Sequence, residues 1–139
     1  MKAAYKLIEH TADIGISVQS FSLAGLFKNA GLAITDLSFK KQTSQYPGKH
    51  NIVIRQKAAN LEELFINWLN ELLSVSAVEA LVFEDIKIIQ INENFVDAIA
   101  IGSDIRNYKF CAEIKAATYH QLKVKKTGLF WQAEVIFDV

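Results

Sequence analysis

The sequence has 139 residues, and 51% of them are hydrophobic, so it can bury the core of one ordinary domain. Its 15 basic residues balance its 15 acidic residues. A strong nucleic-acid binder normally carries a basic surplus that neutralises phosphates, so this balance argues against tight direct binding of RNA or DNA by the chain alone.

Features that are missing from the sequence indicate the cellular compartment of the protein and its number of domains. Its single cysteine, Cys111, has no partner for an intrachain disulfide, and in an alternating strand-like stretch it is interpreted as a small core residue. No basic and apolar leader and no long uncharged apolar run is present, so we expect a cytoplasmic protein without a membrane span. No repeat or Pro/Gly-rich linker divides the sequence, which predicts a single domain over residues 1–139.

The first part of the sequence predicts two strands and a helix. Period-2 alternation and short apolar runs predict strands over residues 4–9 and 14–20. Apolar residues at helical spacing predict a helix over residues 23–37, following the N-cap Ser22. Two glycines inside this helix weaken it by about 1 kcal/mol each relative to alanine.

The middle of the sequence predicts a turn, a strand and a second helix. The cluster Ser44–Gly48 contains the only proline and reads as a surface turn before a strand over residues 50–56. Leucine and aromatic residues over 61–73 follow i, i+3, i+4, i+7 spacing, the pattern of an amphipathic helix. A stripe of this kind is more often core than a cofactor-binding face, and we interpret it as core.

The remaining sequence predicts strands only, the last two joined by a hairpin turn at Lys125–Gly128. Two helices among about eight strands, with several strands in direct succession, predict an α+β fold in which antiparallel β-sheets pack against two main helices. These strands cover residues 81–91, 95–102, 108–118, 120–126 and 130–139.

Acidic residues stand near both ends of the sequence. Asp13 follows the first predicted strand and precedes Gly15, and Asp138 interrupts an apolar final strand just before Val139. If the two ends converge, two Asp carboxylates and the terminal carboxylate or carbonyl of Val139 form an all-oxygen ligand set. The alternatives are an Asx turn at Asp13 and a solvent-facing side chain at Asp138.

The donor atoms indicate which cation such a site would prefer. Carboxylate and carbonyl oxygens favour Ca²⁺ or Mg²⁺. Zinc usually takes His or Cys ligands as well, and His10 and His120 could supply nitrogen, so zinc stays open as the less favoured ion. The alternative for each histidine is a hydrogen bond to a backbone carbonyl or an acid.

A second polar group lies in the segment Glu113–His120. Strand alternation places Lys115 on the same side as Glu113 and Ala117. Lys115 therefore projects toward the metal carboxylates or toward a partner, or it forms a cross-strand ion pair worth under about 1 kcal/mol on a solvated face. No Ser/His/Asp order, phosphate-cradling glycine loop or Cys/His zinc spacing appears, which argues against a stand-alone enzyme.

Five motifs follow one another in chain order from one end of the sequence to the other. They are His10-Thr11-Ala12-Asp13-Ile14-Gly15, Trp68-Leu69-Asn70-Glu71-Leu72-Leu73, Leu81-Val82-Phe83, Glu113-Ile114-Lys115-Ala116-Ala117-Thr118-Tyr119-His120 and Val135-Ile136-Phe137-Asp138-Val139. Taken together, these motifs resemble the archease family. The sequence departs from the family pattern in the first helix at Ser22–Phe27 and over the basic segment Phe39–Lys49.

The resemblance implies a small cytosolic α+β protein with a metal site at Asp13, Asp138 and Val139. It also implies a protein cofactor of the GTP-dependent tRNA-splicing RNA ligase, which promotes guanylylation of the ligase's active-site histidine and hence repeated turnover. Lys115 is then expected to act at the ligase surface. The alternatives are a chaperone-like modulator of nucleic-acid methyltransferases and a small metallohydrolase that would use His10 or His120 as an extra ligand or base.

Overall fold

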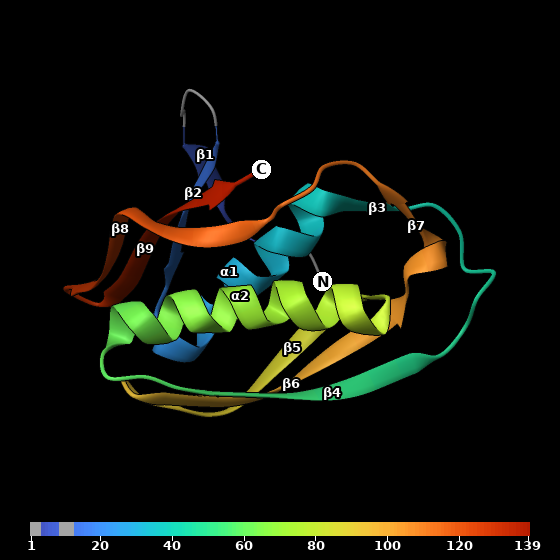
Figure 1. The fold of residues 1–139 in the computed structure, drawn as a ribbon. Helices are drawn as coiled ribbons and strands as arrows, with labels where there is room; N and C mark the ends of the chain where they lie inside the picture. Colours follow the sequence, from blue (N-terminus) through green and yellow to red (C-terminus); the bar gives the residue numbers. More distant parts are fainter. Residues whose placement is uncertain (1–3, 9–12) are drawn as a thin grey trace.

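Two antiparallel β-sheets enclose a layer of two helices (Figure 1). The structure is a computed structural model, and it describes residues 4–8 and 13–139. In chain order the elements are β1 (Lys6–Ile8), β2 (Ile14–Ser20), α1 (Leu23–Ser38), β3 (Phe39–Lys41), β4 (Lys49–Lys57), α2 (Leu61–Glu79), β5 (Leu81–Ile91), β6 (Phe95–Asp104), the 3-10 helix η1 (Ile105–Asn107), β7 (Tyr108–Phe110), β8 (Ala116–Thr127) and β9 (Phe130–Asp138).

The strands form a four-stranded sheet in the order β1-β2-β9-β8, a three-stranded sheet in the order β4-β6-β5, and a two-stranded ribbon of β3 and β7. All the pairings are antiparallel. Helix α1 packs on β5 and β2, and α2 packs on β8 and β4. The predicted α+β class is confirmed, but each helix contacts both large sheets rather than covering one sheet face. None of the helices in the described part of the chain is long and apolar enough to cross a membrane.

Helix α1 begins where its cap predicts. The side chain of Ser22 accepts a hydrogen bond from the amide of Gly25 at 3.0 Å. Close packing explains why a glycine, which has a low helix propensity, stands at position 31 inside the helix. A Cβ at this position would lie 2.8 Å from the Cδ1 atoms of Ile86 on β5 and Leu72 on α2. The glycine therefore lets α1 approach both neighbours closely.

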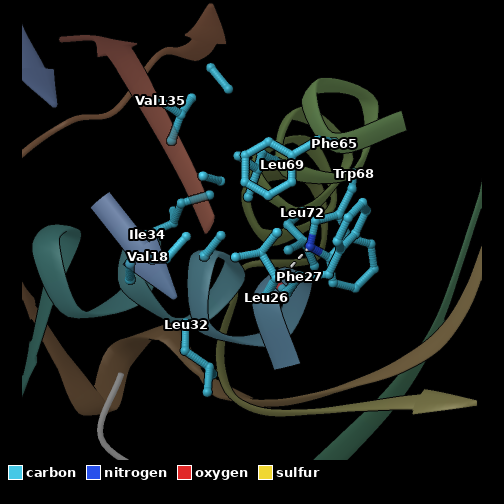
Figure 2. Close-up of a cluster of buried hydrophobic side chains, with 14 of the residues drawn as sticks. Val18, Leu26, Phe27, Leu32, Ile34, Phe65, Trp68, Leu69, Leu72 and Val135 are labelled. Atoms are coloured by element: carbon cyan, nitrogen blue, oxygen red, sulfur yellow. Dashed lines mark hydrogen bonds between the residues drawn. The ribbon is translucent and has the colours of Figure 1, made fainter. Parts of the chain in front are cut away.

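Helix α2 carries the centre of the core (Figure 2). Trp68 is fully buried, and its Nε1 donates a hydrogen bond to the carbonyl of Phe27 on α1 at 2.9 Å. Phe27 and Phe65 meet edge to face with ring centroids 5.2 Å apart. The helix continues to Glu79, six residues past the predicted end, and stops at Ala80, whose backbone is left-handed (φ 54°, ψ 46°).

The predicted strand over residues 108–118 is wrong. Two strands in different sheets take its place: its first three residues form β7, paired with β3, and its last three begin β8 in the four-stranded sheet. β7 ends after Phe110 because its partner β3 begins only at Phe39, directly after α1. The amide of Cys111 still donates to the carbonyl of Ser38 at 2.8 Å, in register with the ribbon. Cys111 is exposed, so its interpretation as a core residue is also wrong.

Strand β8 also differs from prediction, because it runs without a break through the gap expected between two strands. It contains a bulge instead. Thr118 pairs with Ile136 and Lys123 pairs with Glu134, so β8 has extra residues between these two pairs. Gln121 in the bulge has a positive φ of 52°. The hairpin turn that follows is confirmed at Gly128, whose φ is 61°.

Candidate functional site

The register of the four-stranded sheet brings the two ends of the chain together. Strand β2 pairs with β9, and the last pair joins Ile14 to Phe137. One further step along this antiparallel ladder places the backbone of Asp13 beside that of Asp138. In Figure 1 the C-terminus accordingly lies close to the start of β2. Asp13 is half-buried and Asp138 is exposed, so this end of the sheet combines two carboxylates with an opening to solvent.

Strand β8 adds Lys115 to the same end. Ala116 pairs with Asp138, and the amide of Lys115 donates to the carbonyl of Asp138 at 2.8 Å. The Lys115 side chain is exposed and makes no ion pair within the described part of the chain, and neither does Glu113. The cross-strand ion pair considered for Lys115 is therefore not formed here, and its ammonium group is available to another molecule.

Asn70 on α2 fixes this part of β8, a role that sequence reasoning missed. Its Oδ1 accepts from the amide of Ala117 at 2.7 Å, and its Nδ2 donates to the carbonyl of Ala117 at 3.2 Å. The amide side chain thus replaces a neighbouring strand at the free edge of β8. The one signal in the sequence was an amide side chain inside a run of leucine and tryptophan residues.

The two histidines considered as additional ligands are His120 and His10. His120 lies in the β8 bulge, four residues past Ala116, where its amide donates to the Thr118 hydroxyl at 3.3 Å. That offset is up to about 13 Å along an extended strand. His10 lies outside the described residues.

The donor set at this end suits a hard cation. Over residues 4–8 and 13–139, no three His, Cys, Asp or Glu side chains gather to form a metal-binding cluster. Asp13 and Asp138 would therefore need main-chain oxygens, such as that of Val139, to complete a coordination sphere. Two carboxylates and main-chain oxygens are the ligands that Ca²⁺ and Mg²⁺ prefer. The residues present fit such an ion better than zinc.

An apolar groove of about 790 Å³ opens beside Lys115. It runs between the C-terminal halves of α1 and α2 and the segment 112–116. The size is that of a typical binding pocket, and apolar side chains dominate its walls. Its lining includes Leu72, Leu73, Phe110, Ile114 and Lys115.

A separate charged cluster surrounds Glu84, at a bulge in β5. Lys49, Lys41 and the Tyr108 hydroxyl all contact its carboxylate. Burial alone would raise the pKa of Glu84, but hydrogen bonds from Lys49 and Tyr108 and the charges of both lysines outweigh it and lower the pKa. Burial and the Glu84 carboxylate raise the pKa of Tyr108. This cluster ties β4 and the β3–β7 ribbon to β5, so we assign it a structural role.

Known proteins resemble this chain over its whole length. The archease protein family matches residues 5–139. The protein archease of Methanosarcina barkeri is 33% identical, with 97% of this chain and 95% of the relative covered. The archease of Archaeoglobus fulgidus is 31% identical, with 97% and 98% covered.

Two solved structures share the fold. The solution structure of Methanobacterium thermoautotrophicum protein 1598 superimposes with a TM-score of 0.72 at 25% identity and covers 97% of this chain and 98% of that one. The crystal structure of an archease, possible chaperone, from Thermotoga maritima gives a TM-score of 0.62 at 24% identity, with both chains covered completely. The chain therefore belongs to the archease family.

Proposed function

We propose that this protein activates a GTP-dependent tRNA-splicing RNA ligase by promoting ligase guanylylation and multiple turnover, without turnover of its own. Membership of the archease family supports the proposal. The observation that carries it is the convergence of three separate motifs. The β2–β9 register and the bond from the Lys115 amide to Asp138 bring Asp13, Asp138 and Lys115 to one end of one sheet.

In this proposal the carboxylates of Asp13 and Asp138, with a main-chain oxygen of Val139, hold a Ca²⁺ or Mg²⁺ ion. The two carboxylates carry like charges that repel each other at this end of the sheet, and a bound cation would neutralise them. The bound ion would hold the start of β2 rigidly against the end of β9. A rigid end of the sheet loses less conformational entropy when it docks on a partner than a frayed end does.

Lys115 and the neighbouring groove supply the contact with the ligase. The lysine has no ion-pair partner of its own in the described structure, and the groove offers an apolar surface that an apolar side chain of a partner can fill. Docking that prefers the GTP-reactive conformation of the ligase would raise the population of that conformation. Bond chemistry then stays in the ligase.

A guanylylation time course of the partner ligase tests this function. Radiolabelled GTP and the ligase are mixed with and without this protein, and covalent labelling is followed with time. We expect faster labelling and more than one ligation per ligase with the wild type, and a loss of that gain with Asp138→Asn. Asp97→Asn is the matched control, because Asp97 pairs with Arg55 at 3.2 Å on the other sheet. Equal stimulation by Asp138→Asn, or none by the wild type, contradicts the proposal.

A chaperone-like modulator of nucleic-acid methyltransferases is the second candidate. The groove of about 790 Å³ favours it, since an apolar surface can hold exposed segments of a client. The name "possible chaperone" belongs to the related Thermotoga maritima protein. Suppressed aggregation of a heated methyltransferase, without any effect on ligase guanylylation, would select this function. Hydrolysis of a phosphoester by the isolated protein with added metal would select a metallohydrolase instead.

A further inference from the structure

The end of the four-stranded sheet opposite Asp138 exposes an aromatic surface. It consists of the β8–β9 hairpin and the turn between β2 and α1, which lie side by side because Ser20 pairs with Trp131. Phe21 is 74% exposed and Leu129 is 78% exposed. Phe21 stacks on Phe130, with ring centroids 4.7 Å apart and ring planes 29° apart. Large apolar side chains gathered in this way at a surface mark a binding site.

The same hairpin is cationic. Lys123, Lys125 and Lys126 lie near its turn, and Glu134 is the acidic residue beside them. Lys123 pairs with Glu134 at 3.8 Å, and the Lys126 ammonium lies 5.9 Å from the centre of the Trp131 ring. Lys125 has no ion-pair partner among the described residues.

Protection of a sheet edge explains only part of this surface. Strand β8 is an edge strand, and lysines on an edge discourage pairing with another chain. That role needs no exposed aromatic rings. The exposed side chains of Phe21 and Leu129 lower the solubility of the protein and do not pack in the core. Their exposure therefore indicates a partner that contacts the aromatic rings and also the lysine ammonium groups.

We propose that this hairpin tip, made of Phe21, Lys125, Lys126, Leu129 and Phe130, binds single-stranded RNA. Unpaired bases stack on aromatic rings, and lysines neutralise the phosphates between them. The tip offers both groups within one hairpin and its neighbouring turn. The choice of RNA as the nucleic acid rests on the proposed function, since an RNA ligase holds free RNA ends.

A lipid surface is the competing partner, and the observations favour RNA over it. An interfacial anchor needs a wide apolar face in addition to cations. Here Phe130 is only 39% exposed because Phe21 covers it, which leaves a single aliphatic side chain and one ring for insertion. A stacked ring pair instead presents a flat face, the shape that fits a nucleobase. With two available lysines the contact is weak, in keeping with the neutral net charge of the chain.

Fluorescence anisotropy of labelled decauridylate tests the proposal with the isolated protein. We expect Phe21→Ala and the double change Lys125→Ala with Lys126→Ala each to weaken binding at least about fivefold. For two phosphate contacts the logarithm of the affinity should fall with the logarithm of salt concentration with a slope of about −1.4. Val78→Ala and Lys109→Ala are the matched controls, because both residues are exposed and lie on α2 and β7.

Absence of binding, or equal binding by the tip variants, overturns the proposal. Binding to phosphatidylserine vesicles without binding to decauridylate overturns it in favour of a lipid surface. The ligase is absent from this experiment, so its result is separate from that of the guanylylation time course. Stimulation of the ligase by a tip variant that has lost RNA binding would leave the proposed function intact.

Discussion

Trp68 connects the two helices through a hydrogen bond inside the core. Its Nε1 donates to the carbonyl of Phe27, and no solvent reaches either group. Trp68→Phe keeps an aromatic ring but leaves this carbonyl without its donor and opens a cavity. We expect a loss of about 2–4 kcal/mol in the free energy of unfolding, measured by urea denaturation.

Trp131→Phe is the matched control for that change. Trp131 is only half-buried on β9, where the Lys126 ammonium lies 5.9 Å from the centre of its ring. Its replacement should cost under about 1 kcal/mol. Equal losses for the two tryptophans would show that the hydrogen bond to Phe27 matters little.

Glu84 makes the stability depend on pH. Its pKa is lowered in the folded protein despite burial, because hydrogen bonds and charges from Lys49, Tyr108 and Lys41 favour the carboxylate. A carboxyl group with a depressed folded pKa contributes stability above its unfolded pKa of about 4.3, and this contribution disappears as the pH falls through the folded pKa. We therefore expect Glu84→Gln to destabilise the protein at pH 7 and to have a smaller effect at pH 3. Thermal unfolding of both proteins at pH 7, 5 and 3 measures this, and a constant difference across the series would contradict it.

At the scale of elements, the end of α2 contains a correctable strain. Ala80 is exposed and left-handed, a conformation that costs an alanine about 1 kcal/mol relative to glycine. Ala80→Gly should therefore raise the free energy of unfolding by about 0.5–1 kcal/mol. Ala77→Gly, one turn earlier and also exposed, should lower it by about 1 kcal/mol because that position is helical. Changes of the same sign at both positions would refute this account of the helix end.

The attachment of α2 to β8 depends on Asn70. Asn70→Ala removes both hydrogen bonds to the backbone of Ala117 and exposes the start of β8 to fraying. We expect a loss of about 1–3 kcal/mol and faster hydrogen exchange at the amides of Ala117 and Lys115. Asn67→Ala on the same helix is the control, since Asn67 makes no side-chain hydrogen bond within the described structure. Unchanged exchange at Ala117 would mean that Asn70 does not position this segment.

At the scale of the whole molecule, the sequence predicts what local interactions determine. The Ser22 cap and the Gly128 turn occur where their local chemistry indicates. The end of β7 after Phe110 was not predictable, because it depends on where the partner strand β3 begins, and only the folded chain pairs these distant segments. Nor could periodicity show that the helices contact two sheets, since an apolar stripe does not reveal how many neighbours cover it.

The candidate site also combines residues that the sequence predicts with a contact that only the folded chain shows. The sequence offers Asp13 and Asp138 as a pair only if the two ends of the chain converge, and the β2–β9 register joins their neighbours Ile14 and Phe137. The Asn70 contact could not be predicted, because the side chain binds a free strand edge that exists only in the assembled sheet. Predicted metal binding by the pair and the predicted action of Lys115 on a ligase remain proposals.

Those proposals depend on a divalent cation at the meeting point of β2 and β9. Isothermal titration calorimetry of the isolated protein with CaCl₂, repeated with MgCl₂, measures it directly. We predict one bound cation per chain for the wild type and for the control Asp97→Asn, and no saturable binding for Asp138→Asn or Asp13→Asn. Equal binding by the wild type and Asp138→Asn, or no binding by the wild type, would contradict the account.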